Sequence, residues 1–207
     1  MAQQTATIRT RRRGKQLEDA LYDAALAELA VAGYGGLTME GIAARARTGK
    51  AALYRRWSSK HDLVQAALLY ALPPLPEPRS DRSARENLLA IFTAHGDVVA
   101  GKTAFPGLRI LNQLLHEPEL RAIFADAVVG PRLRIIESVL QAGAANGEID
   151  AATLTPYTAR VGTALINQQV LLTDAPPNKR QLAQIVDTVV ARPASVRAGG
   201  RRSRVAR

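Results

Sequence analysis

Apolar residues recur at three- and four-residue spacing along most of the chain, whereas no convincing run of alternating apolar and polar residues occurs. The first such stretch, 16–32, carries Leu17, Leu21, Ala25 and Leu29 on one stripe and acidic residues on the opposite side. This spacing is typical of an amphipathic helix that buries one face. The pattern therefore predicts an all-α protein that begins with such a helix.

The stretch 38–60 predicts two short helices joined by a tight turn. Thr38 is a suitable N-cap for the first of them, because a threonine hydroxyl in that position accepts a bond from a free backbone amide. A glycine then lets the chain turn, and inward-facing pairs lie on both sides of it. These pairs are Ile42 with Ala46 and Leu53 with Trp57. The arrangement indicates a helix–turn–helix whose outward face carries Lys50, Tyr54 and Arg55.

The rest of the chain reads as helices divided by proline and glycine breaks. A proline at the first helical position and a serine or threonine just before it are typical helix starts. The next predicted helix is capped by Ser58 or Ser59 and ends before the prolines of 73–78, and another begins at Ser80 or Ser83. A longer segment runs from Pro118 to Asn146-Gly147, with a break or kink at Gly130-Pro131. The last two predicted helices run from Thr155-Pro156 to about Leu172 and from about Lys179 to Ala191.

Positive charge is concentrated in three places. The segment 9–15 carries +5, the helix–turn–helix stretch 38–60 carries +5 and the segment 192–207 carries +6, whereas the rest of the chain is net negative and brings the formal net charge to +10. Cation density beside a helix–turn–helix is what phosphate binding requires, although incidental charge on a solvated helix pair gives the same count. The N-terminal arm suits the DNA backbone or minor groove as well as it suits a solubilising tail, whereas the C-terminal segment fits a disordered tail better.

The run 46–57, Ala-Arg-Thr-Gly-Lys-Ala-Ala-Leu-Tyr-Arg-Arg-Trp, resembles a signature of the TetR family of bacterial repressors. That signature reads Ala-Gly-Val-Ser-Lys-Gly-(Thr/Ser)-Leu-Tyr-x-(His/Tyr)-Phe, and matching features on three helices extend the resemblance over 15–68. Three positions depart from it: Arg47 replaces a turn glycine, Gly49 a capping serine and Ala52 a hydroxyl residue. The resemblance implies a three-helix DNA-binding headpiece joined to a larger helical domain for ligand binding and dimerisation.

Carried over position by position, the resemblance implies a set of DNA contacts with Lys50 and Tyr54 foremost. The full set is Thr38, Arg47, Thr48, Lys50, Ala51, Ala52, Tyr54, Arg55, Arg56 and Lys60. The predicted domains are a disordered basic arm over 1–14, the headpiece over 15–60, an effector-binding and dimerisation domain over 61–192 and a disordered basic tail over 193–207.

The resemblance also implies a small-molecule pocket and a homodimer built on the last two helices. Polar residues among apolar ones point to the pocket, because a few placed polar groups give an apolar cavity its specificity. The pocket candidates are His95, Asn112, His116, Asn167 and Gln168, with Asn167 and Gln168 preferred. The candidate dimer contacts are Val161, Leu165, Leu182, Ile185 and Val189, although ordinary core packing accounts equally well for about half of the apolar residues there.

The chemistry of an enzyme is missing from the sequence. The three histidines, His61, His95 and His116, lie on separate segments without metal-ligand spacing, and no nucleophile or nucleotide motif occurs. There is no cysteine, no membrane-spanning run and no hydrophobic signal core, which suits a cytoplasmic protein without cofactors. The resemblance, with no enzyme motif to set against it, implies a regulator that binds operator DNA and leaves it on binding a small molecule. The alternative is a sequence-tolerant DNA-binding protein that uses its basic tails.

Overall fold

The computed structural model describes residues 14–110 and 116–190, and every secondary-structure element within them is helical. The predicted arm, tail and pocket residue Asn112 lie outside these ranges, apart from Gly14 at the start of the first helix. The elements are α1 (Lys15–Gly36), α2 (Met39–Arg45), α3 (Lys50–Tyr54), α4 (Lys60–Ala71), α5 (Ala84–Val99), η1 (Gly107–Ile110), α7 (Pro118–Ile123), η2 (Phe124–Val129), α8 (Gly130–Ala145), η3 (Ala151–Thr153), α9 (Thr158–Thr173) and α10 (Lys179–Val189). The predicted all-α class is therefore confirmed.

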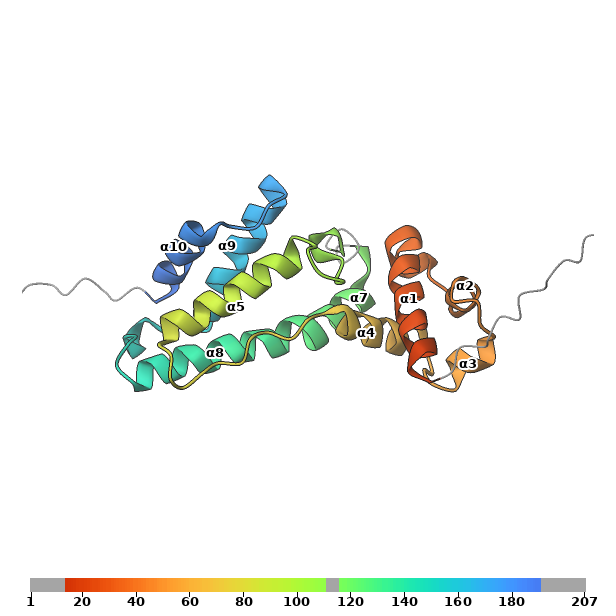
Figure 1. Ribbon diagram of the computed structural model, residues 1–207, viewed down its shortest axis with the longest axis horizontal. Coiled ribbons are helices and arrows are strands. Elements are labelled where there is room, and N and C mark those ends of the chain that lie inside the picture. The colour runs from red at the N-terminus through yellow and green to blue at the C-terminus, as the bar shows by residue number, and fades with distance from the viewer. Residues whose placement is uncertain (1–13, 111–115, 191–207) are drawn as a thin grey trace, which may run out of the picture.

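The molecule is elongated, with α1–α3 at one end and α9 and α10 toward the other (Figure 1). The long helices α5 and α8 run side by side along the larger body, and α4 and α7 lie between this body and the first three helices. A headpiece and a larger helical body are thus distinct but joined.

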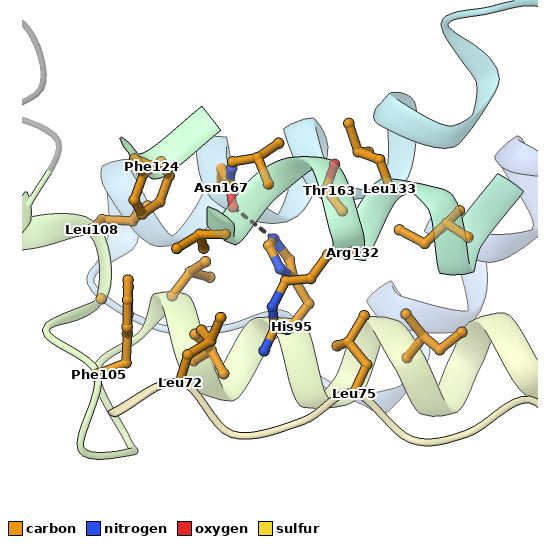
Figure 2. Close-up of a pocket in the computed structure, with 17 residues that line it drawn as sticks. Leu72, Leu75, His95, Phe105, Leu108, Phe124, Arg132, Leu133, Thr163 and Asn167 are labelled. Carbon is orange, nitrogen blue, oxygen red and sulfur yellow. Dashed lines mark hydrogen bonds between the residues drawn. The ribbon is translucent and has the colours of Figure 1, made fainter. Parts of the chain in front are cut away.

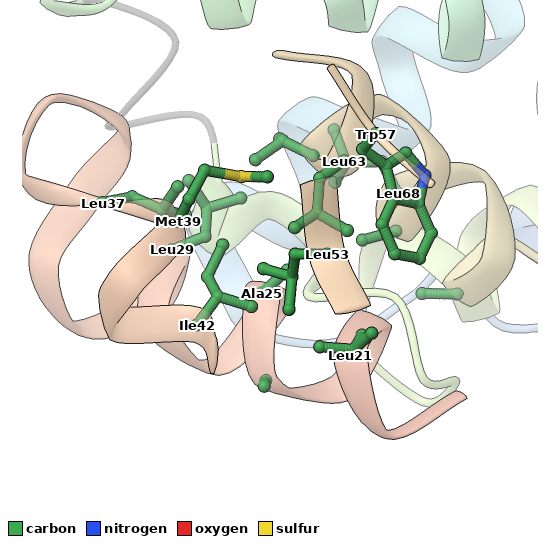
Figure 3. Packing of buried hydrophobic residues seen from close by; sticks show 14 of the residues in the cluster. Leu21, Ala25, Leu29, Leu37, Met39, Ile42, Leu53, Trp57, Leu63 and Leu68 are labelled. Atoms are coloured by element: carbon green, nitrogen blue, oxygen red, sulfur yellow. The ribbon is translucent and has the colours of Figure 1, made fainter. Parts of the chain in front are cut away.

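The headpiece core contains the residues that the apolar spacing predicts. The stripe of α1 is buried, as are the two inward pairs of α2 and α3 with their flanking residues (Figure 3). The hydroxyl of Thr38 caps α2 by accepting a hydrogen bond from the Gly41 backbone N–H at 3.0 Å. Gly33, the predicted end of the first helix, has a φ of 70° and forms a kink, beyond which one more helical turn follows.

The same core extends out of the headpiece into the larger body. α4, which Ser59 caps, packs along α1 and buries Leu63 and Leu68. Leu120 and Ile123 of α7 belong to this apolar cluster too. Displacement of α7 will therefore be felt by α4 and α1, because close-packed interiors transmit strain.

A second apolar cluster holds α5, α8, α9 and α10 together. Within this cluster Phe92 on α5 packs closely on Gly162 of α9, where a Cβ on the glycine would lie 2.2 Å from the Phe92 ring. Only a glycine allows the two helices to approach this closely. The crossing of α5 and α9 is thereby fixed at one point.

Helix boundaries agree with the sequence in some places and differ in others. The predicted break at Gly130-Pro131 is a π-helical turn, η2, that leads directly into α8, and proline explains it because it has no N–H to donate inside a helix. α9 begins at Thr158 and not at Pro156. The Thr158 hydroxyl accepts the Thr155 backbone N–H at 2.9 Å, so a capped turn replaces the predicted first helical turn.

Candidate nucleic-acid interface and effector cavity

The outward face of α3 carries the side chains that a major-groove helix would present. Lys50, Ala51, Tyr54 and Arg55 are all exposed, whereas Leu53 is fully buried. The exposed set matches the predicted contact face. Whether these side chains contact DNA remains a prediction.

Ala52 requires a correction, because it is only 3% exposed and packs in the headpiece core. Consecutive residues of a helix are about 100° apart around its axis, and the buried stripe of a packed helix is at least that wide. The stripe therefore covers both Ala52 and Leu53. A side chain in that position cannot reach DNA in this conformation. Ala52 is therefore removed from the predicted DNA contacts.

Arg47 occupies the turn in a left-handed conformation, with a φ of 54°. This conformation costs an L-residue with a Cβ on the order of 1 kcal/mol and is the one that glycine adopts freely. The arginine is exposed, in the turn between α2 and α3. The departure from the glycine of the family signature thus has a conformational cost and adds a cation beside the candidate interface.

Several other cations of the headpiece already have partners inside it. Lys50 Nζ lies 3.0 Å from Glu40 Oε1, and hydrogen bonding to Lys50 lowers the pKa of that exposed carboxyl. Arg45 pairs with Glu28 at 2.5 Å. Arg47 and Arg55 form no ion pair within the described residues, so they are the cations most available to phosphate.

Other residues predicted to contact DNA form hydrogen bonds or pack within the headpiece. Lys60 Nζ donates to the Tyr34 carbonyl at 3.0 Å and lies 4.4 Å from the centre of the Tyr34 ring. Arg56 donates through Nη1 to the Ala52 carbonyl at 3.1 Å, while the Thr38 hydroxyl serves as the α2 cap. Thr48 is half-buried in the turn. These groups order the headpiece, whatever further contact they make with DNA.

Two glutamates at the start of α7 hold the headpiece to the larger body. Tyr34 Oη donates to Glu119 Oε2 at 3.0 Å, and the Gly35 backbone N–H donates to Glu117 Oε1 at 2.9 Å. Burial, followed by the bond to Glu119, raises the pKa of Tyr34 to about 12. The sequence does not reveal the bond between Tyr34 and Glu119, because no local pattern links residues 85 positions apart.

A cavity of about 100 Å³ lies in the larger body between α5, η1, η2, α8 and α9. Most of its lining is apolar. The polar lining residues are His95, Arg132, Thr163 and Asn167. Figure 2 shows Arg132 and His95 beside each other in the middle of the surrounding apolar side chains.

His95 and Asn167 form a polar pair across the cavity. Their His95 Nε2 and Asn167 Oδ1 atoms are 2.9 Å apart. An amide oxygen only accepts, so Nε2 carries the ring proton in this arrangement. Burial lowers the pKa of His95 to about 4, an effect that the bond to Asn167 opposes in part, so the imidazole is neutral at pH 7.

Arg132 was not predicted as a cavity residue. Its Nη2 donates to the Pro73 carbonyl, whereas its buried Nη1 has no hydrogen-bond partner among the described residues. Burial lowers the pKa of the guanidinium. The sequence did contain a signal, because Arg132 interrupts an apolar stripe formed by Val128 and Ile136 at four-residue spacing.

The structure places only some of the other predicted pocket residues in the cavity. His95 and Asn167 line the cavity, and that they bind a ligand stays a prediction. His116 and Gln168 are exposed and do not line it, so both predictions are wrong for this cavity. Residue 168 directly follows Asn167, and a rotation of about 100° along α9 carries its side chain to the outer face.

That outer face of α9 is rich in exposed apolar side chains. Leu165, Leu171 and Leu172 are 38%, 68% and 74% exposed. Of the predicted dimer contacts, Leu165 lies here, and Val161 and Ile185 are half-buried. Leu182 and Val189 need correction, because they are only 5% and 6% exposed and fill the second cluster of their own subunit.

The described parts of the chain hold neither a candidate metal cluster nor a membrane-spanning helix. No group of three or more histidine, aspartate or glutamate side chains in 14–110 or 116–190 could hold a metal ion. None of the helices found there combines the length and apolarity needed to cross a bilayer.

Comparisons with known proteins agree with both halves of the structure. The family model described as bacterial regulatory proteins, tetR family, matches residues 21–67, and the model described as tetracyclin repressor-like, C-terminal domain, matches 79–189. An uncharacterized HTH-type transcriptional regulator of Mycobacterium tuberculosis (strain H37Rv) is 27% identical over 161 residues, which are 76% of this chain and 78% of that protein.

Solved structures share the fold. The flavonoid-responsive regulator FrrA has a TM-score of 0.66 and 17% identity, with coverage of 85% of this chain and 94% of that one. The transcriptional regulator FadR of Bacillus subtilis, solved in complex with stearoyl-CoA, has a TM-score of 0.59 and 19% identity, with coverage of 83% and 97%. The two family matches together span the headpiece and the helical body, and the chain belongs to the TetR family of transcriptional regulators, with a DNA-binding helix–turn–helix.

Proposed function

We propose that this protein is a homodimeric, cytoplasmic repressor that leaves its operator when a small molecule occupies the cavity. The observation that carries this proposal is the connection between cavity and headpiece. Phe124 and Val128 of η2 line the cavity, and η2 continues the same helical course as α7. At its other end α7 holds Tyr34 and Gly35 through Glu119 and Glu117.

Operator binding is assigned to the exposed face of α3 and to the turn before it. Lys50 and Tyr54 are exposed on the helix, while Arg47 and Arg55, which form no ion pair among the described residues, supply positive charge nearby. A recognition helix that reads base edges needs flanking phosphate contacts to fix its register. This arrangement supports specific binding that weakens steeply as salt rises.

The outer face of α9 supports the dimer. Leu165 and Leu172 lie seven residues apart on it, and the half-buried Val161 precedes them by four residues. An exposed apolar stripe at this spacing packs well against a copy of itself, because helix pairs bury such stripes together. Two headpieces are also what two operator half-sites about one helical turn apart require.

The names of two related structures support a small-molecule effector. FrrA is described as flavonoid-responsive, and the Bacillus subtilis FadR structure contains stearoyl-CoA. In our proposal the effector favours an arrangement of η2 and α7 in which the headpieces no longer match the operator spacing. Differential affinity for the two arrangements is the only property that the effector needs.

The DNA-binding part of the proposal is tested by titrating the protein onto DNA that flanks its own gene. Lys50→Ala and Tyr54→Ala should each lower affinity by about tenfold, the loss expected for one charge-assisted or base-edge contact. Lys179→Ala is the matched control, because Lys179 is an equally exposed cation at the start of α10. Equal behaviour of all three variants would show that α3 does not recognise this DNA.

A further inference from the structure

A half-buried guanidinium without a counter-ion among the described residues distinguishes the cavity. Arg132 lines it with a buried Nη1 that has no hydrogen-bond partner among the described residues, and the guanidinium forms no ion pair there. No carboxylate is among the lining residues that the structure describes. The neighbouring His95 is neutral at pH 7, and Thr163 and Asn167 carry no charge.

The guanidinium remains protonated despite its burial, because arginine does not lose its proton in proteins. Burying a charge costs free energy unless an opposite charge pairs with it. A cation that folding places in an apolar cavity, away from water, therefore binds an anion strongly. The planar guanidinium fork matches a carboxylate group in geometry as well as in charge.

We propose that the effector cavity binds a small monocarboxylate whose anionic head meets Arg132 and whose apolar body fills the rest of the space. This inference rests on the proposed function, in which the same cavity holds the effector. One guanidinium beside a neutral imidazole balances one negative charge, which favours a carboxylate over a phosphate ester with a charge near −2. Because His95 occupies Asn167 Oδ1, the amide NH₂ of Asn167 remains a donor for the head group.

Cavity size limits the apolar body. The volume is about 100 Å³, and a dry cavity of roughly 150 Å³ accepts benzene. The apolar lining includes Ile91, Phe124 and Leu133. A cavity smaller than the one that accepts benzene favours a small acid, with a short chain or at most one ring, over a long acyl chain.

The test measures binding of benzoate and hexanoate, together with benzamide and hexanamide, to the full-length protein by calorimetry and by thermal shift. The amides have the same bodies and lack the charge. At least one acid should bind about tenfold or more tightly than its amide, which is the factor expected for a charge-assisted hydrogen bond. Arg132→Met should remove this preference while leaving amide binding unchanged.

Arg134→Met is the matched control, because Arg134 lies two residues further on α8 and is exposed. Circular dichroism confirms that each variant is folded, and Arg132→Lys supplies a second substitution that keeps the charge and loses the fork. Retention of tenfold acid preference in Arg132→Met, equal affinity for acids and amides, or absence of acid binding would each overturn the proposal.

Operator release is measured in parallel and separates this inference from the proposed function. If an amide binds and releases DNA as well as its acid does, the cavity is an effector site but not an anion site. If an acid binds through Arg132 and the protein stays on DNA, the anion site is correct and its effector role is not.

Discussion

The hydrogen bond from Tyr34 to Glu119 is the contact through which α7 reaches the headpiece most directly. Tyr34 is only 2% exposed and donates at 3.0 Å, whereas Glu119 is exposed and can be rehydrated. Tyr34→Phe removes the donor and leaves no buried acceptor unpaired. The loss should therefore be about 1 kcal/mol, within the usual net value of a hydrogen bond.

If this bond belongs to the DNA-binding arrangement and breaks on release, its removal shifts the equilibrium toward release by the same amount. The effector concentration that releases half of the operator should then fall about fivefold, because 1.4 kcal/mol corresponds to a factor of ten. The melting temperature should fall by about 2–4 °C.

The assay follows operator release by fluorescence anisotropy during titration with benzoate or hexanoate, whichever binds more tightly. Tyr22→Phe is the matched control, because Tyr22 Oη donates to Glu18 at 2.8 Å within α1 and this bond does not link the headpiece to α7. Glu119→Gln combined with Tyr34→Phe should add little to either change alone. If Tyr34→Phe and Tyr22→Phe have the same midpoint of release, the proposed route through α7 is wrong.

Three further predictions concern strain, packing and protonation. Arg47→Gly should raise the free energy of unfolding by about 1 kcal/mol, because glycine adopts a positive φ without strain. It should also reduce the salt dependence of DNA binding by about one phosphate contact. Unchanged DNA affinity would show that Arg47 does not contact DNA. Gly162→Ala should lower the free energy of unfolding by about 1–3 kcal/mol through overpacking against Phe92, whereas Gly49→Ala, whose added Cβ meets no atom within 4 Å, should change it little in denaturant titrations. His95 has a folded pKa of about 4 and an unfolded value near 6.5, so the unfolded state binds more protons between these values. The free energy of unfolding is therefore unaffected by His95 protonation above pH 6.5 and falls by about 3 kcal/mol as the pH drops to 4. In His95→Gln the free energy of unfolding should depend less on pH over that window.

Helical spacing predicted the headpiece well because each of its short helices buries a regular stripe. Leu21, Ile42 and Leu53 are fully buried for that reason. Ala52 shows the limit of the method, since a family signature assigns a role to a position without showing which way this particular side chain points. The wrong start of α9 has a similar cause, because proline suits a first helical turn but the Thr158 hydroxyl stabilises a different turn.

The candidate site was harder to predict because it is assembled from distant segments. Asn167 was found because it interrupts an apolar helix, and the same signal at Arg132 was present but was not recognised. Leu182 and Leu165 are both apolar residues on the last two helices, yet one fills its own subunit and the other is exposed. Spacing alone cannot separate a core stripe from an interface stripe, since both are apolar at the same period.

The central claim is that a small molecule in the cavity controls specific DNA binding by the helix–turn–helix. Footprinting on DNA that flanks the protein's own gene, with and without benzoate or hexanoate, tests it most directly. We predict protection of one two-fold symmetric site with half-sites about one helical turn apart, and loss of that protection when the acid is added. Uniform protection without a preferred site, or a footprint that neither acid changes at concentrations that saturate the cavity, would contradict the account.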